Sequence, residues 1–148
     1  MRSPPGRRVC MVTSSLPRWE GDSTTPFVLH LARDLVELGW DVRLLAPHAP
    51  GAAARETLEG VPVDRFRYLF PEEAQTVCYR GGALVNLRDH PADHLKVPAL
   101  VAAEWGALTR RLLSGKIDLV HSHWVLPQGF VGALASLPFR ARHVTTVH

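Results

Sequence analysis

Near its N-terminus the sequence contains two short apolar runs on either side of an amphipathic segment, and this pattern constrains the fold most. The runs RVCMVT (8–13) and DVRLLA (41–46) are typical of buried parallel strands. The segment between them, PFVLHLARDLVELG, has apolar residues at helical spacing. It begins with Pro26 after Thr25, a favourable N-cap, and it ends at Gly39. A strand, a helix and a strand in this order predict a right-handed parallel crossover.

The rest of the chain continues this alternation. We expect further strands at 60–69, 117–122 and 143–148, and helices at 71–80, 98–115 and 128–137. The alternation predicts an α/β domain with a doubly wound, Rossmann-like parallel sheet over residues 8–148, after a disordered N-terminal tail at 1–7. In the common strand order, the strand at 8–13 is central and lies between those at 41–46 and 117–122.

The composition excludes several classes of protein. The chain has 148 residues, of which 46% are hydrophobic and 21% charged, as in one ordinary globular domain. Its net charge of +3 comes from scattered arginines rather than a clustered patch, so we expect no nucleic-acid partner. The sequence shows no signal-peptide pattern and no apolar run of about 18 residues. We therefore expect a cytoplasmic protein, with a weak peripheral attraction to anionic lipid at the inner face of the membrane.

Polar and aromatic residues follow the strands that we expect to lie side by side. Doubly wound sheets bind ligands outside the carboxyl ends of their strands, where the strand order reverses. Three segments converge there: the loop after the first strand, the run from His121 to Trp124, and the run from Thr146 to His148. The candidates in the loop are Ser14, Ser15, Arg18, Trp19, Gly21 and Asp22. The loop has neither a G-x-G-x-x-G nor a Walker pattern, which argues against a dinucleotide or P-loop phosphate site.

Each candidate also has a plainer interpretation. His121 and His123 lie two residues apart, on one face of a strand, and such a pair can bind a metal ion. No other His/Asp cluster completes that site, so we favour a hydrogen-bonded structural role for His121, with His123 the more exposed of the two. Trp124 is either a packing residue or a platform on which a sugar stacks. Position alone makes His148 a catalytic candidate.

Taken together, these segments resemble the N-terminal domain of family-4 retaining glycosyltransferases, which have the GT-B fold of two facing Rossmann-like domains. The resemblance rests on RVCMVTSSLPRWEGDSTTPFVLHLARDLVELGWDVRLLAP, GVPVDRFRYL, DLVHSHWVLPQGFVGALA and HVTTVH, in this order. A strand, then D-[LV]-[VI]-H-x-H, then an aliphatic helix is a habit of that family. The resemblance covers nearly the whole chain after residue 8.

The resemblance implies roles for the candidate residues. It implies that the C-terminal domain holds most of the nucleotide-sugar and that the N-terminal domain binds the acceptor. The loop from Ser14 to Thr25 then borders the donor phosphates and the acceptor, with His123 and Trp124 as further substrate-binding residues, and His148 approaches the transferred sugar as the catalytic residue. Many members have a Gly-Gly pair in this loop, whereas this sequence has Glu20-Gly21-Asp22.

The resemblance also implies a function in carbohydrate biosynthesis. We expect transfer of a hexosyl group, with retention, from a nucleotide-sugar to a carbohydrate or lipid-linked acceptor. We expect no metal and no cofactor, because no carboxylate pair follows a strand. The sequence stops before the remaining strands of this domain and before the nucleotide-sugar domain, so we expect an incomplete N-terminal half that is inactive alone. Two alternatives stay open: a non-catalytic Rossmann-like binding domain, and a metallohydrolase that uses His121 and His123.

Overall fold

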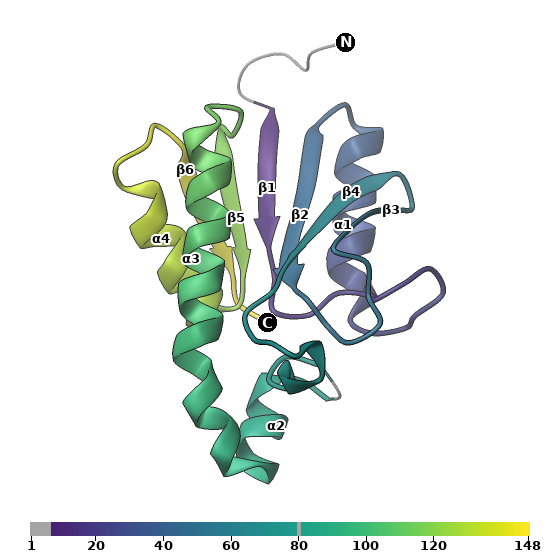
Figure 1. The fold of residues 1–148 in the computed structure, drawn as a ribbon. Coiled ribbons are helices and arrows are strands. Elements are labelled where there is room, and N and C mark those ends of the chain that lie inside the picture. Colours follow the sequence, from purple (N-terminus) through teal and green to yellow (C-terminus); the bar gives the residue numbers. More distant parts are fainter. Residues whose placement is uncertain (1–6, 80) are drawn as a thin grey trace.

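The computed structural model describes residues 7–79 and 81–148 and shows an α/β domain (Figure 1). Its elements are β1 (Arg8–Val12), α1 (Pro26–Glu37), β2 (Asp41–Pro47), β3 (Arg55–Leu58), β4 (Val61–Phe66), the 3-10 helix η1 (Glu72–Ala74), α2 (Ala83–Asp89), the 3-10 helix η2 (Pro91–Lys96), α3 (Val97–Leu113), β5 (Leu119–His123), the π-helical turn η3 (Val125–Gly129), α4 (Phe130–Ser136) and β6 (Arg142–Thr146). The tail expected at 1–7 lies outside the described residues, except for Arg7.

Within the described residues, six strands form one sheet in the order β3-β4-β2-β1-β5-β6. β1 pairs in parallel with both β2 and β5, and the pairs β2–β4 and β5–β6 are parallel as well, whereas β3 runs antiparallel to β4. This confirms the doubly wound α/β class and the central position of the first strand. Because neighbouring parallel strands end at the same edge of the sheet, the segments that follow β1, β5 and β6 lie together.

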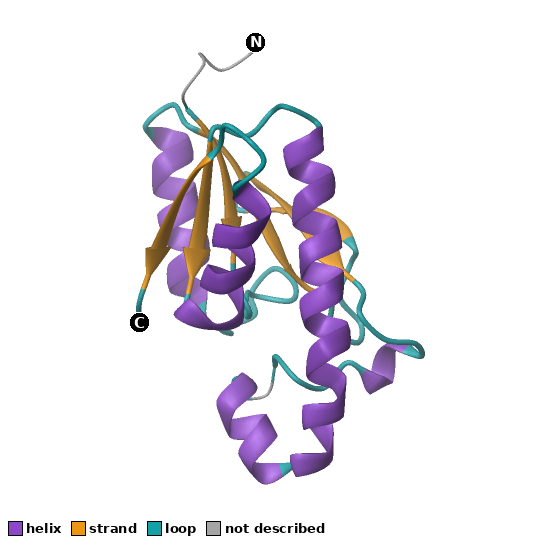
Figure 2. Ribbon diagram, turned by 90° about the vertical axis from the view of Figure 1, so that its left-hand side faces the viewer, coloured by secondary structure: helices purple, strands orange, loops and turns teal. Residues whose placement is uncertain are grey.

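Helices cover both faces of the sheet, with α1 on one face and α3 and α4 on the other (Figures 1 and 2). The side chains of β1 alternate between two cores. Val9 and Met11 pack on the α1 side, and Cys10 and Val12 pack on the α3 side. All of these side chains are buried. Burial on both faces explains why the strand has a continuous apolar run instead of an alternating pattern.

The region between β4 and α3 differs from the prediction. The helix expected at 71–80 is limited to the single turn η1. Buried side chains hold the segment after it, because Gln75 accepts a hydrogen bond from the backbone N–H of Tyr68 and Asn86 donates one to the carbonyl of Val77. Side chains that bond the backbone in this way replace the hydrogen bonds of a helix.

The sequence pattern also does not indicate β3, a short strand at the edge of the sheet. It turns back onto β4 through Glu59 and Gly60, which both have positive φ angles. β3 has the sequence RETL, so three of its four residues are polar and no alternating apolar face indicates a strand. The connection from β2 to the parallel strand β4 therefore runs through a hairpin and not through a helix.

Candidate functional site

Two histidines meet where β5 and β6 end. His123 is the last residue of β5, and the register of the sheet places it opposite Thr146 at the end of β6. His123 Nδ1 lies 3.0 Å from His148 Nε2. The two rings are stacked, with centroids 5.3 Å apart and an angle of 9° between their planes. The structure thus brings together the two histidines that the strand order predicts at one edge.

The relative exposure of His121 and His123 is the reverse of the expectation, which was therefore wrong. His123 is fully buried, whereas His121 is half-buried and has its Nε2 atom 2.7 Å from Thr146 Oγ1. The reason is that β5 continues through His123, so this residue still lies within the sheet and is covered by His148. The rings of His121 and His123 are 4.3 Å apart, which confirms that they project from one face.

Burial disfavours the charged form of both strand histidines. Desolvation, followed by the charges of His121 and His148, lowers the pKa of His123 to about 3. Burial is also the main cause that lowers the pKa of His121. His123 Nε2 is buried without a hydrogen-bond partner among the described residues, so the contact through Nδ1 is the polar interaction that orients the exposed ring of His148.

Aromatic side chains flank His148 on its other sides. The ring of Phe27, from α1, has its centroid 4.7 Å from that of His148, and the ring of Trp124 lies 5.0 Å away. Trp124 has a φ of 72°, which is uncommon for a residue other than glycine. Its backbone N–H donates a hydrogen bond to the carbonyl of Thr146. Trp124 packs against the α1-side core and also lines a cavity, so both interpretations of this residue agree with its position.

The loop after β1 is held in place by its own polar side chains. The hydroxyl of Thr13 donates to the carbonyl of Ser15, and Ser15 Oγ lies 2.9 Å from Thr25 Oγ1. Thr25 therefore joins the loop and makes no side-chain cap on α1, contrary to the expectation. Arg18 Nε donates to Asp22 Oδ2 over 2.9 Å, and this hydrogen bond is the main cause that lowers the pKa of Asp22.

A cavity of about 920 Å³ lies beside this loop. Of the expected site residues, those that line it are Ser14, Ser15, Arg18 and Trp124. Those that do not line it are Trp19, Gly21, Asp22, His123 and His148. Trp19 is exposed and lies under the guanidinium of Arg18, 4.4 Å from the ring centroid. His148 is connected to the cavity wall through its contacts with Phe27 and Trp124, which both line it.

Much of the cavity wall is apolar and comes from segments that the sequence patterns do not single out. The apolar residues that the prediction missed include Phe27, Leu84, Val85, Val125, Leu126 and Val147. Leu84 and Leu126 are 85% and 72% exposed. Large exposed apolar side chains around one cavity mark a binding surface. The sequence signal for them is a pair of apolar residues beside a turn, at Leu84-Val85 and at Val125-Leu126, and the fold brings the two pairs to one cavity.

The chemistry available at this edge is hydrogen bonding from histidine and hydroxyl groups. Within residues 7–79 and 81–148, no group of three or more His, Cys, Asp or Glu side chains is placed to hold a metal ion. The nitrogens of the H-x-H pair instead contact other groups: His121 Nε2 contacts Thr146, and His123 Nδ1 contacts His148. Both cysteines, Cys10 and Cys78, are free and buried elsewhere in the core.

Residues 24–148 match the family model described as a glycosyl transferase 4-like domain. The chain belongs to this family. This match confirms the resemblance of the sequence to a family-4 glycosyltransferase domain, and the cavity belongs to a domain of a sugar-transferring enzyme whose substrates include sugar derivatives. No curated protein matches the chain. In the described part of the glycosyltransferase 4-like domain, no helix combines the length and the apolar character needed to cross a membrane.

Proposed function

We propose that this glycosyltransferase 4-like domain forms the acceptor side of a retaining hexosyltransferase of the GT-B fold. In this proposal the donor is a nucleotide-sugar that a second, C-terminal domain holds, and neither a metal ion nor a cofactor takes part. The observation that carries the proposal is the contact between His123 and His148 beside an apolar cavity, at the ends of β1, β5 and β6. Sheets of this class bind their ligands at this edge.

His148 is the catalytic residue in this proposal, and His123 positions it. In this proposal the single ring N–H of a neutral His123 is on Nδ1 and donates to His148 Nε2, which lies 3.0 Å away. A neutral His148 that accepts through Nε2 has its own proton on Nδ1, which leaves that N–H for a hydroxyl group of the transferred sugar. A donor whose orientation is set before the reaction stabilises charge that develops on the sugar.

The cavity supports an acceptor that has an apolar part. Leu84, Val85 and Leu126 supply apolar wall, while Ser14 and Arg18 supply polar groups at the same cavity. Specific ligand sites commonly combine apolar walls with a few polar groups that fix orientation. A lipid-linked acceptor fits this distribution better than a fully hydroxylated sugar does. The corresponding location is the cytoplasm, with weak peripheral association at the inner face of the membrane.

Transfer assays on a form of the protein that carries the donor domain test this proposal. We expect His148→Ala to lower turnover on the order of 10²-fold, with a much smaller change in donor binding, because the lost group acts on the transferring sugar. The control is His94→Ala, which changes an exposed histidine on η2 that does not line the cavity. Mass spectrometry of products from a panel of nucleotide-sugars measures turnover, and NMR of the anomeric centre measures retention.

Other outcomes would favour the alternatives. Normal turnover in the His148→Ala variant would contradict the catalytic role. Saturable sugar binding without any transfer would favour a non-catalytic binding domain. One equivalent of zinc after dialysis, lost in a His123→Ala variant, would instead favour a metallohydrolase.

A further inference from the structure

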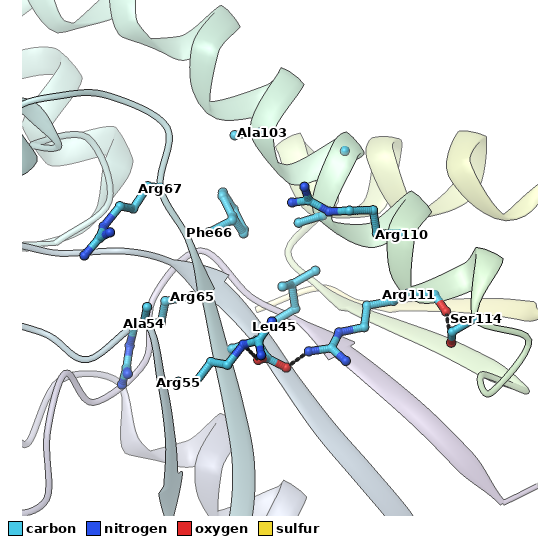
Figure 3. Close-up of a pocket in the computed structure, with 13 residues that line it drawn as sticks. Leu45, Ala54, Arg55, Arg65, Phe66, Arg67, Ala103, Arg110, Arg111 and Ser114 are labelled. Carbon is cyan, nitrogen blue, oxygen red and sulfur yellow. Dashed lines mark hydrogen bonds and ion pairs between the residues drawn. The ribbon is translucent and has the colours of Figure 1, made fainter.

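A second cavity, of about 720 Å³, lies on the α3 side of the sheet and shares no lining residue with the first (Figure 3). α3 forms one wall, through residues such as Ala103, Arg110 and Arg111, and the strands β3 and β4 form the opposite wall. Nothing in the proposed glycosyl transfer uses this cavity. Its lining is rich in arginine, and we refer to it as the arginine cavity.

The topology explains why the arginine cavity is open. The connection from β2 to β4 is the hairpin through β3, so within the described residues no crossover helix from this connection covers the α3-side face of β4. α3 lies over the neighbouring part of the sheet (Figure 1). Leu45, Phe66 and Ala107 add buried apolar groups to the lining.

Two guanidinium groups, from Arg55 and Arg111, meet at the carboxylate of Asp64, and a third, from Arg110, lines the same cavity. Asp64 lies opposite Arg55 in the β3–β4 register, 3.4 Å from its Nε atom, and Asp64 also pairs with Arg111 of α3. Arg110 is exposed on the same helix and makes no ion pair with the described residues. Together these three arginines and the single aspartate carry a net charge of +2.

The remaining arginines of the lining add less to the site. The guanidinium of Arg65 is buried and already occupied, because it pairs with Glu56 and donates to the carbonyl of Pro17. Arg67 is exposed and points away from Arg110 in Figure 3. The groups that define the site are therefore Arg55, Arg110 and Arg111. The carboxylate of Asp64, which pairs with two of them, marks a position where these arginines stabilise a negative charge.

We propose that the arginine cavity binds an oxyanion ligand of the phosphate or diphosphate class. Guanidinium groups offer planar pairs of N–H donors that match the oxygens of phosphate groups. Arg110 provides donors that have no acidic partner, and Arg55 and Arg111 share a single carboxylate, so a doubly charged ligand neutralises the excess charge. The groups come from β3, β4 and α3, three elements that the fold brings around one cavity.

Titration of the 148-residue chain with inorganic pyrophosphate, at constant ionic strength, tests this proposal. Isothermal titration calorimetry is expected to show saturable binding that weakens about fivefold in Arg110→Gln, the effect of one partly exposed charge. Arg110 is exposed, so this variant retains the fold. The control is Arg140→Gln, an exposed arginine outside the cavity, which is expected to bind like the wild type. Constant ionic strength is essential, because salt alone screens surface charges beyond about 10 Å.

A second variant acts in the opposite direction. Asp64→Asn removes the carboxylate that competes for Arg55 and Arg111, so pyrophosphate is expected to bind more tightly and to raise the melting temperature more than it does for the wild type. Absence of saturable binding, or equal affinity of the wild type, Arg110→Gln and Asp64→Asn, would overturn the proposal.

Vesicles identify the source of the phosphate group. Retention of the chain on phosphatidylcholine vesicles that contain phosphatidylglycerol, but not on pure phosphatidylcholine, would assign a lipid headgroup if pyrophosphate competes and Arg110→Gln weakens retention. Pyrophosphate binding without vesicle retention would assign a soluble phosphate ester. Vesicle retention that is insensitive to Arg110→Gln and to pyrophosphate would place lipid contact elsewhere and count against this cavity.

Discussion

His123 is expected to lower the free energy of unfolding as the pH falls from about 7 to about 5, whereas Glu104, whose pKa burial raises, acts in the opposite direction over the same range. The pKa of His123 is about 3 in the folded protein, against an ordinary value of 6.5. Between these two values the unfolded chain binds a proton at His123 and the folded chain does not. Stability from this residue is therefore fully present above pH 6.5 and is lost progressively as the pH falls toward 3.

The size of the effect follows from the burial of this ring. A difference of one pKa unit corresponds to about 1.36 kcal/mol. At pH 5 the histidine of an unfolded chain is almost fully protonated, so lowering the pH from 7 to 5 removes about 2 kcal/mol through His123 alone. The pKa values of His121 and His143 are also lowered, and these residues change stability in the same direction.

Urea unfolding of the wild type and of His123→Asn at the two pH values measures this effect. Asparagine keeps a polar atom near the position of Nδ1 but does not titrate. On going from pH 7 to pH 5, the change in the free energy of unfolding is therefore expected to be about 2 kcal/mol more positive in the variant than in the wild type. His30→Asn, on the exposed face of α1, is the matched control and is expected to change with pH as the wild type does. An equal change between the two pH values in the wild type and in His123→Asn would refute the conclusion that the fold requires a neutral histidine here.

Two further predictions concern packing and a buried acid. Gly132→Ala is expected to lower the free energy of unfolding by about 1–3 kcal/mol, because the added Cβ would lie 2.4 Å from Ser122 Oγ. Its control is Gly106→Ala, in which the added Cβ has no neighbour within 4 Å, and this variant is expected to be neutral or stabilising. Thermal unfolding of both variants measures the difference. Burial raises the pKa of Glu104 to about 8 from 4.5, so stability falls as the pH rises between these values. Glu104→Gln is therefore expected to raise the free energy of unfolding by about 2–3 kcal/mol at pH 7 in urea. An equal gain at pH 4 would show that titration is not the cause.

Much of the architecture is predictable from local patterns. The apolar run at 8–13 is buried on both faces of a sheet, and the run PFVLHLARDLVELG forms the amphipathic helix α1. The order of strands and helices then predicts a parallel sheet with the first strand near its centre. The same reasoning places His123 near His148, since the carboxyl ends of adjacent parallel strands meet.

Side-chain environments were harder to predict, because they depend on where a strand stops and on what covers it. His123 is buried because β5 extends one residue further than expected, to His123 itself, and because the ring of His148 stacks on it. The hydroxyl of Thr25 is occupied by Ser15, a partner that a helix-capping rule does not consider. Periodicity describes which face a residue occupies, but it carries no information about the opposing surface.

The sequence by itself determined the class of fold, the order of the main strands and the edge of the sheet where the candidate site lies, since these follow from hydrophobic periodicity and chain connectivity. The tertiary structure alone decided which distant segments share a cavity. Leu84 and Leu126 line one cavity, and Arg55 and Arg111 meet at Asp64 in the other, although each pair is more than 40 residues apart. Such contacts come from the packing of one element on another, which local sequence patterns do not encode.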